Sequence, residues 1–430
     1  MEVKAGYKET EVGVIPEDWE VAAIDSLGRR GRPAVKAGPF GSSLTKNTYV
    51  AEGYKVYGQE QVIRGDHLYG DYYISKERFN ELRSCAVEPG DILLSLVGTA
   101  GRVLVIPPGA PEGIINPRLI RFSFDPDVIF STYFRFLFET DAYQALLARN
   151  AQGGTMGVLN AGLLRPIRIP LPRVPEQIAI AAALSDVDAL IASLEKLIAK
   201  KRNIKQGAMQ QLLTGKKRLP GFIGKWETKT FEDVADKNVK WSITGGPFGS
   251  NLKASDYTSE GVRIIQLQNI GDGVFNDEYK IYTSKEKANE LLSCNIYPGE
   301  IILSKMGDPV ARACFVPSKD ERYLMSSDGI RLVVDESTFH TRFVHDYINS
   351  IYFRQKAIDV STGTTRQRIG LSDLKKLPFV HPPLPEQTAI ANIFSDMDAE
   401  IQELEHKLAK YEMIKRGMMQ ELLTGKKRLI

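Results

Sequence analysis

The residues with the clearest potential for chemistry lie in a short loop, "GTTRQR", from Gly363 to Arg368. A guanidinium group can bind guanine through two parallel hydrogen bonds, which is the commonest base-specific contact of proteins with DNA. A plain structural interpretation also fits, in which the loop caps a helix and its arginines face solvent or pair with acids. The candidate residues here are Thr364, Thr365, Arg366 and Arg368, with Thr155 in the earlier loop "GGTMGVLN".

Amide side chains form a second group of candidates, because asparagine and glutamine can bind adenine in the major groove. They follow a predicted strand in "IIQLQNIGDG", and the counterpart earlier in the chain is "YGQEQVIRGD". Gln266 and Gln268 share one face of the predicted strand, so a polar outer face is the structural alternative. The candidates are Gln266, Gln268 and Asn269 in one stretch, and Gln59, Gln61 and Arg64 in the other.

Two near-identical turns, "GPFGSSL" from Gly38 and "GPFGSNL" from Gly246, place glycine on both sides of Pro-Phe. The structural interpretation is a tight turn that needs positive φ, with Phe40 and Phe248 filling the core. The functional interpretation is that backbone N–H groups bind a phosphate. For the following side chains we keep both readings open, and these are Ser42, Ser43, Ser250 and Asn251.

Two further loops, "LVGTAGR" and "KMGDPVAR", each follow a predicted buried strand. Thr99, Arg102 and Lys305 are candidates there for contacts with phosphates or bases, and a plain hairpin turn is the alternative. The basic sequence "GKKRL" occurs twice, and cations at a helix C-terminus are favourable without any ligand.

Sequence signals for catalysis are missing. No GxGxxG motif follows a strand, and "LLTGKK" lacks the upstream glycine and the Ser/Thr of a phosphate-binding loop. The chain has three cysteines without metal-ligand spacing and five scattered histidines. We therefore expect a chain that is not an enzyme and that binds no cofactor or metal.

A long internal repeat must position these loops. Pro175-Glu176-Gln177 recurs as Pro385-Glu386-Gln387, and "MQQLLTGKKRL" at 209–219 recurs as "MQELLTGKKRL" at 419–429, both 210 residues later. The turns above recur at offsets of 208 or 209, so the chain consists of two units of similar plan.

The best-matched part of each unit predicts a long helix. Apolar residues alternate in steps of three and four, which is typical of a coiled-coil seam. Proline at the first turn and Gly215 or Gly425 after the last apolar residue predict a helix over 176–214 and its repeat, each roughly 58 Å long. The seam positions are Leu184, Val187, Ile191, Leu194 and Ile198, and Phe394, Met397, Ile401, Leu404 and Leu408. Two equivalent helices in one chain favour an antiparallel, two-fold pair, which brings the two termini together.

The remaining parts predict two mixed α/β globules, from short β-branched strands bounded by Gly or Pro and one late helical run each. A hydrophobic content of 43% supports real cores, and a net charge of +3 neither requires nor excludes DNA. We expect a cytoplasmic protein, because no apolar leader opens the chain and no stretch approaches membrane-spanning length.

With the repeated "PEQ" and "LLTGKKRL", and the segment "LSDLKKLPFVHPPLPEQ", the whole chain resembles the specificity subunit of type I restriction–modification systems. The resemblance implies an α/β fold with two target recognition domains, 1–174 and 220–384, joined by two long antiparallel helical regions, 175–219 and 385–430.

The family also implies partners. The chain is expected to bind double-stranded DNA, two methyltransferase subunits and restriction/translocase subunits, with no membrane. S-adenosylmethionine, ATP and Mg are expected only on the partner subunits. The alternatives are a stand-alone DNA-binding regulator and an enzyme with an inter-domain active site.

Overall fold

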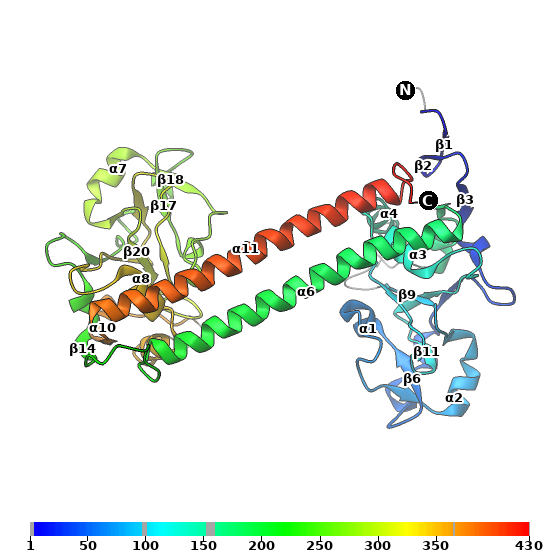
Figure 1. The fold of residues 1–430 in the computed structure, drawn as a ribbon, viewed down its shortest axis with the longest axis horizontal. Coiled ribbons are helices and arrows are strands. Elements are labelled where there is room, and N and C mark those ends of the chain that lie inside the picture. The colour runs from blue at the N-terminus through cyan, green and yellow to red at the C-terminus, as the bar shows by residue number, and fades with distance from the viewer. Residues whose placement is uncertain (1–3, 97–100, 152–159, 364–365, 430) are drawn as a thin grey trace. The chain divides into compact units, whose positions relative to one another are not determined.

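The computed structural model describes residues 4–96, 101–151, 160–363 and 366–429 (Figure 1). The chain forms two compact units. Unit 1 contains Met1–Glu195 and His406–Ile430, and unit 2 contains Lys196–Glu405. Each unit therefore holds one globule, the first half of one long helix and the second half of the other.

The globule of unit 1 is built on small, mostly antiparallel sheets. Only β6 and β11 pair in parallel among its described strands. A hairpin of β1 (Tyr7–Thr10) and β2 (Gly13–Pro16) precedes a pair formed by β3 (Glu20–Ala23) and β13 (Arg168–Leu171). The four-stranded sheet has the order β10 (Val103–Val105), β9 (Ile92–Ser95), β12 (Leu119–Phe122), β4 (Val35–Ala37). The five-stranded sheet has the order β5 (Tyr49–Val50), β7 (Tyr73–Ile74), β6 (Tyr54–Tyr57), β11 (Gly113–Ile115), β8 (Ala86–Val87).

The globule of unit 2 repeats the last three of these sheets. Its two-stranded pair is β14 (Glu227–Thr230) with β24 (Pro378–His381). The four-stranded order is β15 (Ile243–Gly245), β23 (Gly329–Leu332), β20 (Ile301–Ser304), β21 (Ala313–Phe315). The five-stranded order is β16 (Tyr257–Thr258), β18 (Ile281–Thr283), β17 (Val262–Ile265), β22 (Tyr323–Met325), β19 (Asn295–Ile296), with β17 and β22 parallel.

The predicted strands are present, and local chemistry explains them. β9 and β20 are buried along their whole length, as expected for continuous apolar runs. Each follows a Pro-Gly turn whose glycine, Gly90 or Gly299, has a positive φ of 85° or 81°. Such a turn needs a residue without a Cβ at that position. Cys85 and Cys294, at equivalent positions of the two units, are buried.

The late helical run of each globule is two helices instead of one. Unit 1 has α3 (Ser131–Phe138) and α4 (Asp141–Ala151), and unit 2 has α8 (Thr341–Ile348) and α9 (Ile351–Asp359). Ser350 starts α9, because its hydroxyl accepts a hydrogen bond from the N–H of Phe353. The short helices of the described chain are α1 (Gln59–Arg64), α2 (Lys76–Glu81), α5 (Ala161–Leu164), α7 (Lys285–Glu290) and α10 (Leu371–Lys376).

The two long helices lie within two residues of their predicted positions. They are α6 (Val174–Leu212) and α11 (Leu384–Leu422), of 39 residues each (Figure 1). Gly215 and Gly425 follow them with φ of 69° and 70°, which confirms the predicted left-handed caps. All ten predicted seam residues are buried or half-buried.

Ion pairs within each unit show that the helices run antiparallel. In unit 1, Lys415 of α11 lies 2.6 Å from Asp188 of α6. In unit 2, the repeat-equivalent pair is Lys205 of α6 with Asp398 of α11, and Lys201 pairs with Glu400, so residue numbers fall along α6 as they rise along α11. Lys205 and Lys415, which continue the seam spacing toward the end of each helix, are thus paired with acids from the opposite helix.

The repeated motifs at the helix ends have matching structural roles. The side-chain oxygen of Gln177 accepts from the N–H of Phe130 at 2.7 Å, and that of Gln387 accepts from His340 at 2.9 Å. Arg218 of the first "GKKRL" binds the carboxylate of Glu386 through two hydrogen bonds of 2.6 Å. Arg428 of the second does the same with Glu176.

The N-terminal segment meets the C-terminal segment inside unit 1, as the repeat predicted. The hydroxyl of Tyr7 donates to the carbonyl of Gly425 at 3.0 Å, and Arg428 pairs with Asp18 at 2.8 Å. Tyr7 and Asp18 therefore contact the segment that follows α11, just as Gly224 contacts Arg218 in the segment that follows α6.

The expectation that no stretch approaches membrane-spanning length was wrong. Among the described residues, α6 is long and apolar enough to cross a membrane by length and composition, with a mean hydropathy of 1.5 over 18 residues. Its alanine-rich first turns raise this value. A single helix of this kind is weak evidence, because core helices pass the same test. In α6, Leu184, Leu194 and Ile198 are buried, and 28% of the apolar window is buried in all.

Candidate nucleic-acid interface

In unit 2, several predicted loops converge on one turn, Ser326 to Asp328. The N–H of Ser326 donates to the carbonyl of Ile265 at 2.9 Å, at the end of β17. On its other side lies the "GPFG" turn, because a Cβ on Gly246 would overlap the carbonyl oxygen of Ser326. The turn therefore brings the Gln266 segment and the "GPFGSNL" segment together.

Lys305 lies in the same place. Its backbone N–H donates to the carbonyl of Asp328 at 2.7 Å, and its ammonium donates to the carbonyl of Ser327 at 3.1 Å. A Cβ on Gly245 would lie 2.5 Å from Lys305 Nζ. Burial lowers the pKa of Lys305 from its ordinary value, and the neighbouring Arg368 lowers it further, whereas Asp328 opposes the shift.

The arginine loop joins this cluster. The N–H of Ile369 donates to the carbonyl of Lys305 at 2.9 Å, and Gly307 donates to Gln367 at 3.2 Å. Arg368 forms an ion pair of 3.2 Å with Asp328, and its side chain is half exposed. Arg366 is exposed. Thr364 and Thr365 lie outside the described residues.

Unit 1 builds the same surface with the same backbone hydrogen bonds. The N–H of Asn116 donates to Tyr57, as Ser326 does to Ile265, and Leu96 donates to Arg118 at 3.1 Å, as Lys305 does to Asp328. A Cβ on Gly38 would overlap the carbonyl oxygen of Asn116. The backbone frame of the two surfaces is therefore equivalent.

The side chains on this shared frame differ. Unit 1 has Leu96, Asn116 and Arg118 where unit 2 has Lys305, Ser326 and Asp328. Gly58 of unit 1 is equivalent to Gln266 of unit 2. The N–H of Gly58 donates to the side chain of Gln61 at 2.9 Å, and the N–H of Gln266 donates to that of Asn269 at 2.9 Å. Asn116, Arg118, Ser326 and Asp328 were not predicted. The repeat could have pointed to them, because an offset of 210 aligns Asn116 with Ser326 and Arg118 with Asp328, and the paired residues differ.

Two predicted base-reading amides have structural roles instead. Asn269 is fully buried, accepts from the N–H of Gln266, and donates to the carbonyls of Asn276 and Tyr279 at 2.8 and 2.9 Å. Gln61 is 2% exposed, and its amide group bonds Gly58 and Tyr69. The prediction that Asn269 and Gln61 contact bases was wrong, because their polar atoms hold the turn closed.

The other amides stay near the surface. β17 ends at Ile265, and Gln266 begins a 3-10 turn, Leu267–Asn269, so Gln266 and Gln268 do not share a strand face as predicted. Gln266 is half-buried and donates to the hydroxyl of Tyr257 at 3.4 Å, whereas Gln268 is exposed.

The counterpart stretch in unit 1 is helical. Gln59 and Arg64 begin and end α1, where Gln59 is half-buried and Arg64 is exposed with its guanidinium 4.1 Å from the ring centre of Tyr69.

The two "GPFG" turns overturn another prediction. Phe40 and Phe248 are 86% and 84% exposed, so they do not fill the cores. Leu44 and Leu252, the last residues of "GPFGSSL" and "GPFGSNL", are the buried plugs, at 7% and 8% exposure.

The remaining candidates differ in accessibility. Ser42, Ser250 and Asn251 are exposed, and Ser43 is half-buried with its carbonyl accepting from Arg78. Arg102 is exposed, and its backbone N–H donates to the hydroxyl of Ser95 at 3.1 Å. Thr99 and Thr155 lie outside the described residues.

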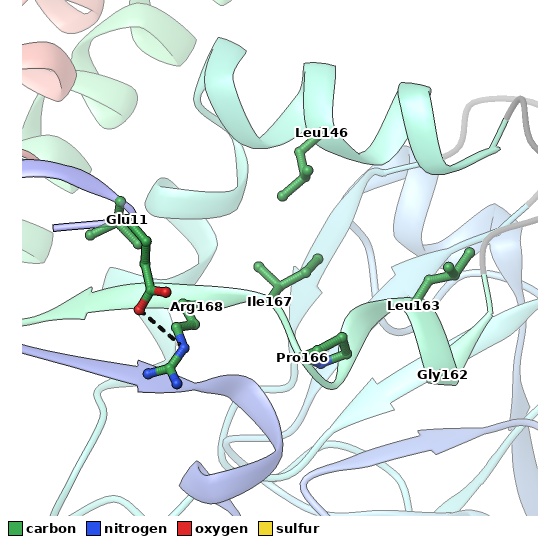
Figure 2. A pocket seen from close by; sticks show the side chains of 8 residues that line it. Glu11, Leu146, Gly162, Leu163, Pro166, Ile167 and Arg168 are labelled. Carbon is green, nitrogen blue, oxygen red and sulfur yellow. Dashed lines mark ion pairs between the residues drawn. The ribbon is translucent and has the colours of Figure 1, made fainter.

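The described chain has hollows at its surface. One, of about 420 Å³, is lined mainly by apolar groups such as Leu146, Leu163 and Ile167, and Glu11 and Arg168 form an ion pair of 3.0 Å at its edge (Figure 2). No group of three or more His, Cys, Asp or Glu residues that could hold a metal ion occurs within the described ranges.

Comparison with known proteins identifies the family of the chain. Residues 16–203 and 223–413 match the family described as type I restriction modification DNA specificity domain. The chain is 24% identical over 437 residues to the type I restriction enzyme MjaVIII specificity subunit of Methanocaldococcus jannaschii, covering 98% of this chain and 96% of that protein. It is 19% identical over 357 residues to the EcoBI specificity subunit of Escherichia coli, covering 79% and 74%.

Solved structures agree on the fold. A chain from a structure on complex assembly and conformational transition of the type I R-M system aligns with a TM-score of 0.57 at 15% identity, covering 96% of this chain and 99% of that one. The type I restriction-modification S subunit from M. genitalium aligns with a TM-score of 0.54 at 15% identity, covering 98% of each chain. The predicted α/β fold with two recognition domains and long linking helices is confirmed. Because the family match spans both repeats, the chain belongs to the type I restriction–modification DNA specificity family.

Proposed function

We propose that this chain reads a bipartite, non-palindromic DNA target, with one half-site per recognition domain. The observation that carries the proposal is the pair of equivalent surfaces around Asn116 and Ser326. They share a backbone frame but carry different side chains at corresponding positions. A shared frame gives the two domains the same approach to DNA, and different donors and acceptors give them different preferred bases.

As a member of a family of specificity subunits, the chain is not itself an enzyme. In our proposal, methyltransferase and restriction subunits dock on the long helices, and S-adenosylmethionine, ATP and Mg are held by those partners. The exposed apolar residues on the outer faces of the helices, Ile204 and Ile414 among them, support a docking role. A cytoplasmic location belongs to the same proposal, because the DNA is there.

The test is methylation-sensitive sequencing of host DNA that carries this chain and its methyltransferase. Two half-sites read from one side of B-DNA lie about one helical turn, roughly 34 Å, apart. We expect two different half-sites separated by a fixed unspecified gap. A contiguous palindrome would contradict the proposal.

Two measurements separate the proposal from its rivals. Co-purification with the methyltransferase distinguishes it from a stand-alone regulator. Saturable binding of S-adenosylmethionine to the isolated chain, measured by calorimetry, would contradict the assignment of that cofactor to the partner.

A further inference from the structure

The two "GPFG" turns each present a phenylalanine to solvent, and the fold holds it there. At 86% and 84% exposure, Phe40 and Phe248 contrast with Leu44 and Leu252, which lie four residues further and are buried. Burying an aromatic side chain is favourable, so a folded chain gains nothing within itself from this arrangement. Its occurrence at the same position of both domains indicates a partner that both domains meet.

The turn beneath each phenylalanine is tightly built. The N–H of Gly38 donates to Leu119 at 3.0 Å, and that of Gly246 donates to Gly329 at 2.8 Å. The carbonyls of Phe40 and Phe248 each accept a backbone N–H from three residues later at 2.8 Å. Neither Gly38 nor Gly246 has room for a Cβ. The backbone of each phenylalanine is therefore held by a turn that packs against the surface described above.

The charge around the two turns identifies the class of partner. In unit 2, Lys305 Nζ lies beside Gly245, Arg368 lies on the same cluster, and Asp328 is the acid paired with Arg368. In unit 1, Arg118 is exposed at the position of Asp328, and Lys46 is exposed just after the turn. An exposed phenylalanine with cationic residues in the same region suits a partner that carries negative charge and also has apolar surface. Duplex DNA has both, because it combines phosphates with sugars and stacked bases.

We infer that Phe40 and Phe248 contact the DNA, one in each half-site, as apolar anchors that do not read sequence. This inference rests on the proposed function. Because the same residue serves two domains with different side chains around it, the anchor cannot discriminate between half-sites. It holds the base-reading positions, such as Lys305 and Ser326 or Leu96 and Asn116, against the base edges. An aromatic wedge between base steps, or a stack on the sugars, gives this sequence-independent contact.

The experiment measures binding of the full-length chain to two labelled duplexes by fluorescence anisotropy. One duplex carries the target mapped by methylation sequencing, and the other carries a scrambled sequence. Phe40→Ala and Phe248→Ala should each weaken binding to both duplexes by a similar factor, about 5-fold to 100-fold, as expected for loss of an aromatic contact with DNA. Phe248→Trp should keep nearly the parent affinity, because the contact is apolar and aromatic.

Controls separate the possible outcomes. Ile223→Ala removes an apolar side chain that is 96% exposed but lies outside the "GPFG" turns, and it should leave affinity unchanged. If the parent chain binds neither duplex, the proposed function fails and the inference with it. If the parent binds and both Phe→Ala variants bind equally well, the inference alone fails. Loss of methyltransferase co-purification in these variants, with unchanged DNA affinity, would also overturn it and assign the two phenylalanines to protein docking.

Discussion

A fragment of residues 1–219 should form a two-fold homodimer. It contains the first globule and all of α6, but it lacks residues 406–429, which belong to unit 1. In the dimer, residues 196–219 of a second copy would take their place. We expect this exchange because the two helical regions match at a constant offset of 210 residues.

The structure shows how closely the substitute would fit. Above, Arg428, Lys415 and Gly425 were shown to contact other residues of unit 1. In the dimer, the equivalent residues of the second copy are Arg218, Lys205 and Gly215. In the core, Met419, Leu422, Leu423 and Leu429 would be replaced by Met209, Leu212, Leu213 and Leu219. Three differences remain among these positions and the seam: Ile198 for Leu408, Lys201 for Tyr411, and Ala208 for the partly buried Met418.

The substitution Leu213→Ala shows how large a loss of dimer stability is expected. Leu213 is fully buried in the intact chain, and its equivalent Leu423 is 2% exposed in the core of unit 1. A buried Leu→Ala change costs about 2–5 kcal/mol. Two copies per dimer therefore cost about 4–10 kcal/mol, which raises the dissociation constant by about three to seven orders of magnitude. The monomer should keep its own stability, because Leu213 would be exposed there.

Light scattering over a concentration series measures this effect. Ile204→Ala is the matched control, since Ile204 is an apolar residue of α6 that is 47% exposed. The dimer with its methyltransferase should modify an interrupted palindrome made of the first half-site and its inverted copy. A fragment that stays monomeric at micromolar concentration, or a Leu213→Ala variant that dimerises as well as the parent, would refute the reasoning.

Three further predictions concern the full-length chain. Arg366→Ala or Arg368→Ala should weaken or relax recognition of one half-site by about 1–3 kcal/mol if a guanine contact is lost, whereas unchanged affinity and site in both variants would make the loop structural. Arg218→Ala should lower the urea midpoint of unit 2, because it leaves the buried carboxylate of Glu386 without its cation; an unchanged midpoint would mean that water replaces the arginine. Hydrogen bonds from Lys319 and then Arg263 lower the pKa of Asp277 to about 2, so its contribution to stability is present above its ordinary pKa of 3.8 and is lost as the pH falls toward 2. Asp277→Asn should flatten the stability of unit 2 between those pH values, and an unchanged acid profile would contradict this.

The long helices could be predicted closely because seam, start and stop signals agree along the sequence. Gly215 and Gly425 fixed the ends, and the step of three and four fixed the buried face. The ion pairs that neutralise Lys205 and Lys415 could not be predicted in the same way. They depend on the register between helices whose residues are 193 or more positions apart in sequence.

The errors at the candidate site have a common physical cause. An asparagine after a strand has the same sequence signature whether it faces a groove or closes a turn, and Asn269 closes a turn. A phenylalanine between glycines is usually a core residue, yet Phe40 and Phe248 are exposed because Leu44 and Leu252 fill the space below the turns. Only tertiary packing decides such cases.

The shared frame has a consequence for how specificity can change. In unit 2, Lys305, Asp328 and Arg368 form one cluster, in which Asp328 pairs with Arg368 and its charge acts on Lys305 against that of Arg368. Replacing Asp328 alone by arginine, the residue that unit 1 has at this position, would place three cations side by side in a half-buried site. Like charges at this range repel strongly when water is partly excluded. Unit 1 avoids this repulsion because its equivalent of Lys305 is Leu96. The residues that distinguish the two surfaces are therefore coupled. Under the proposed function, a change of specificity requires the exchange of several of these positions together, and replacement of a whole globule on the common helices achieves this in one step.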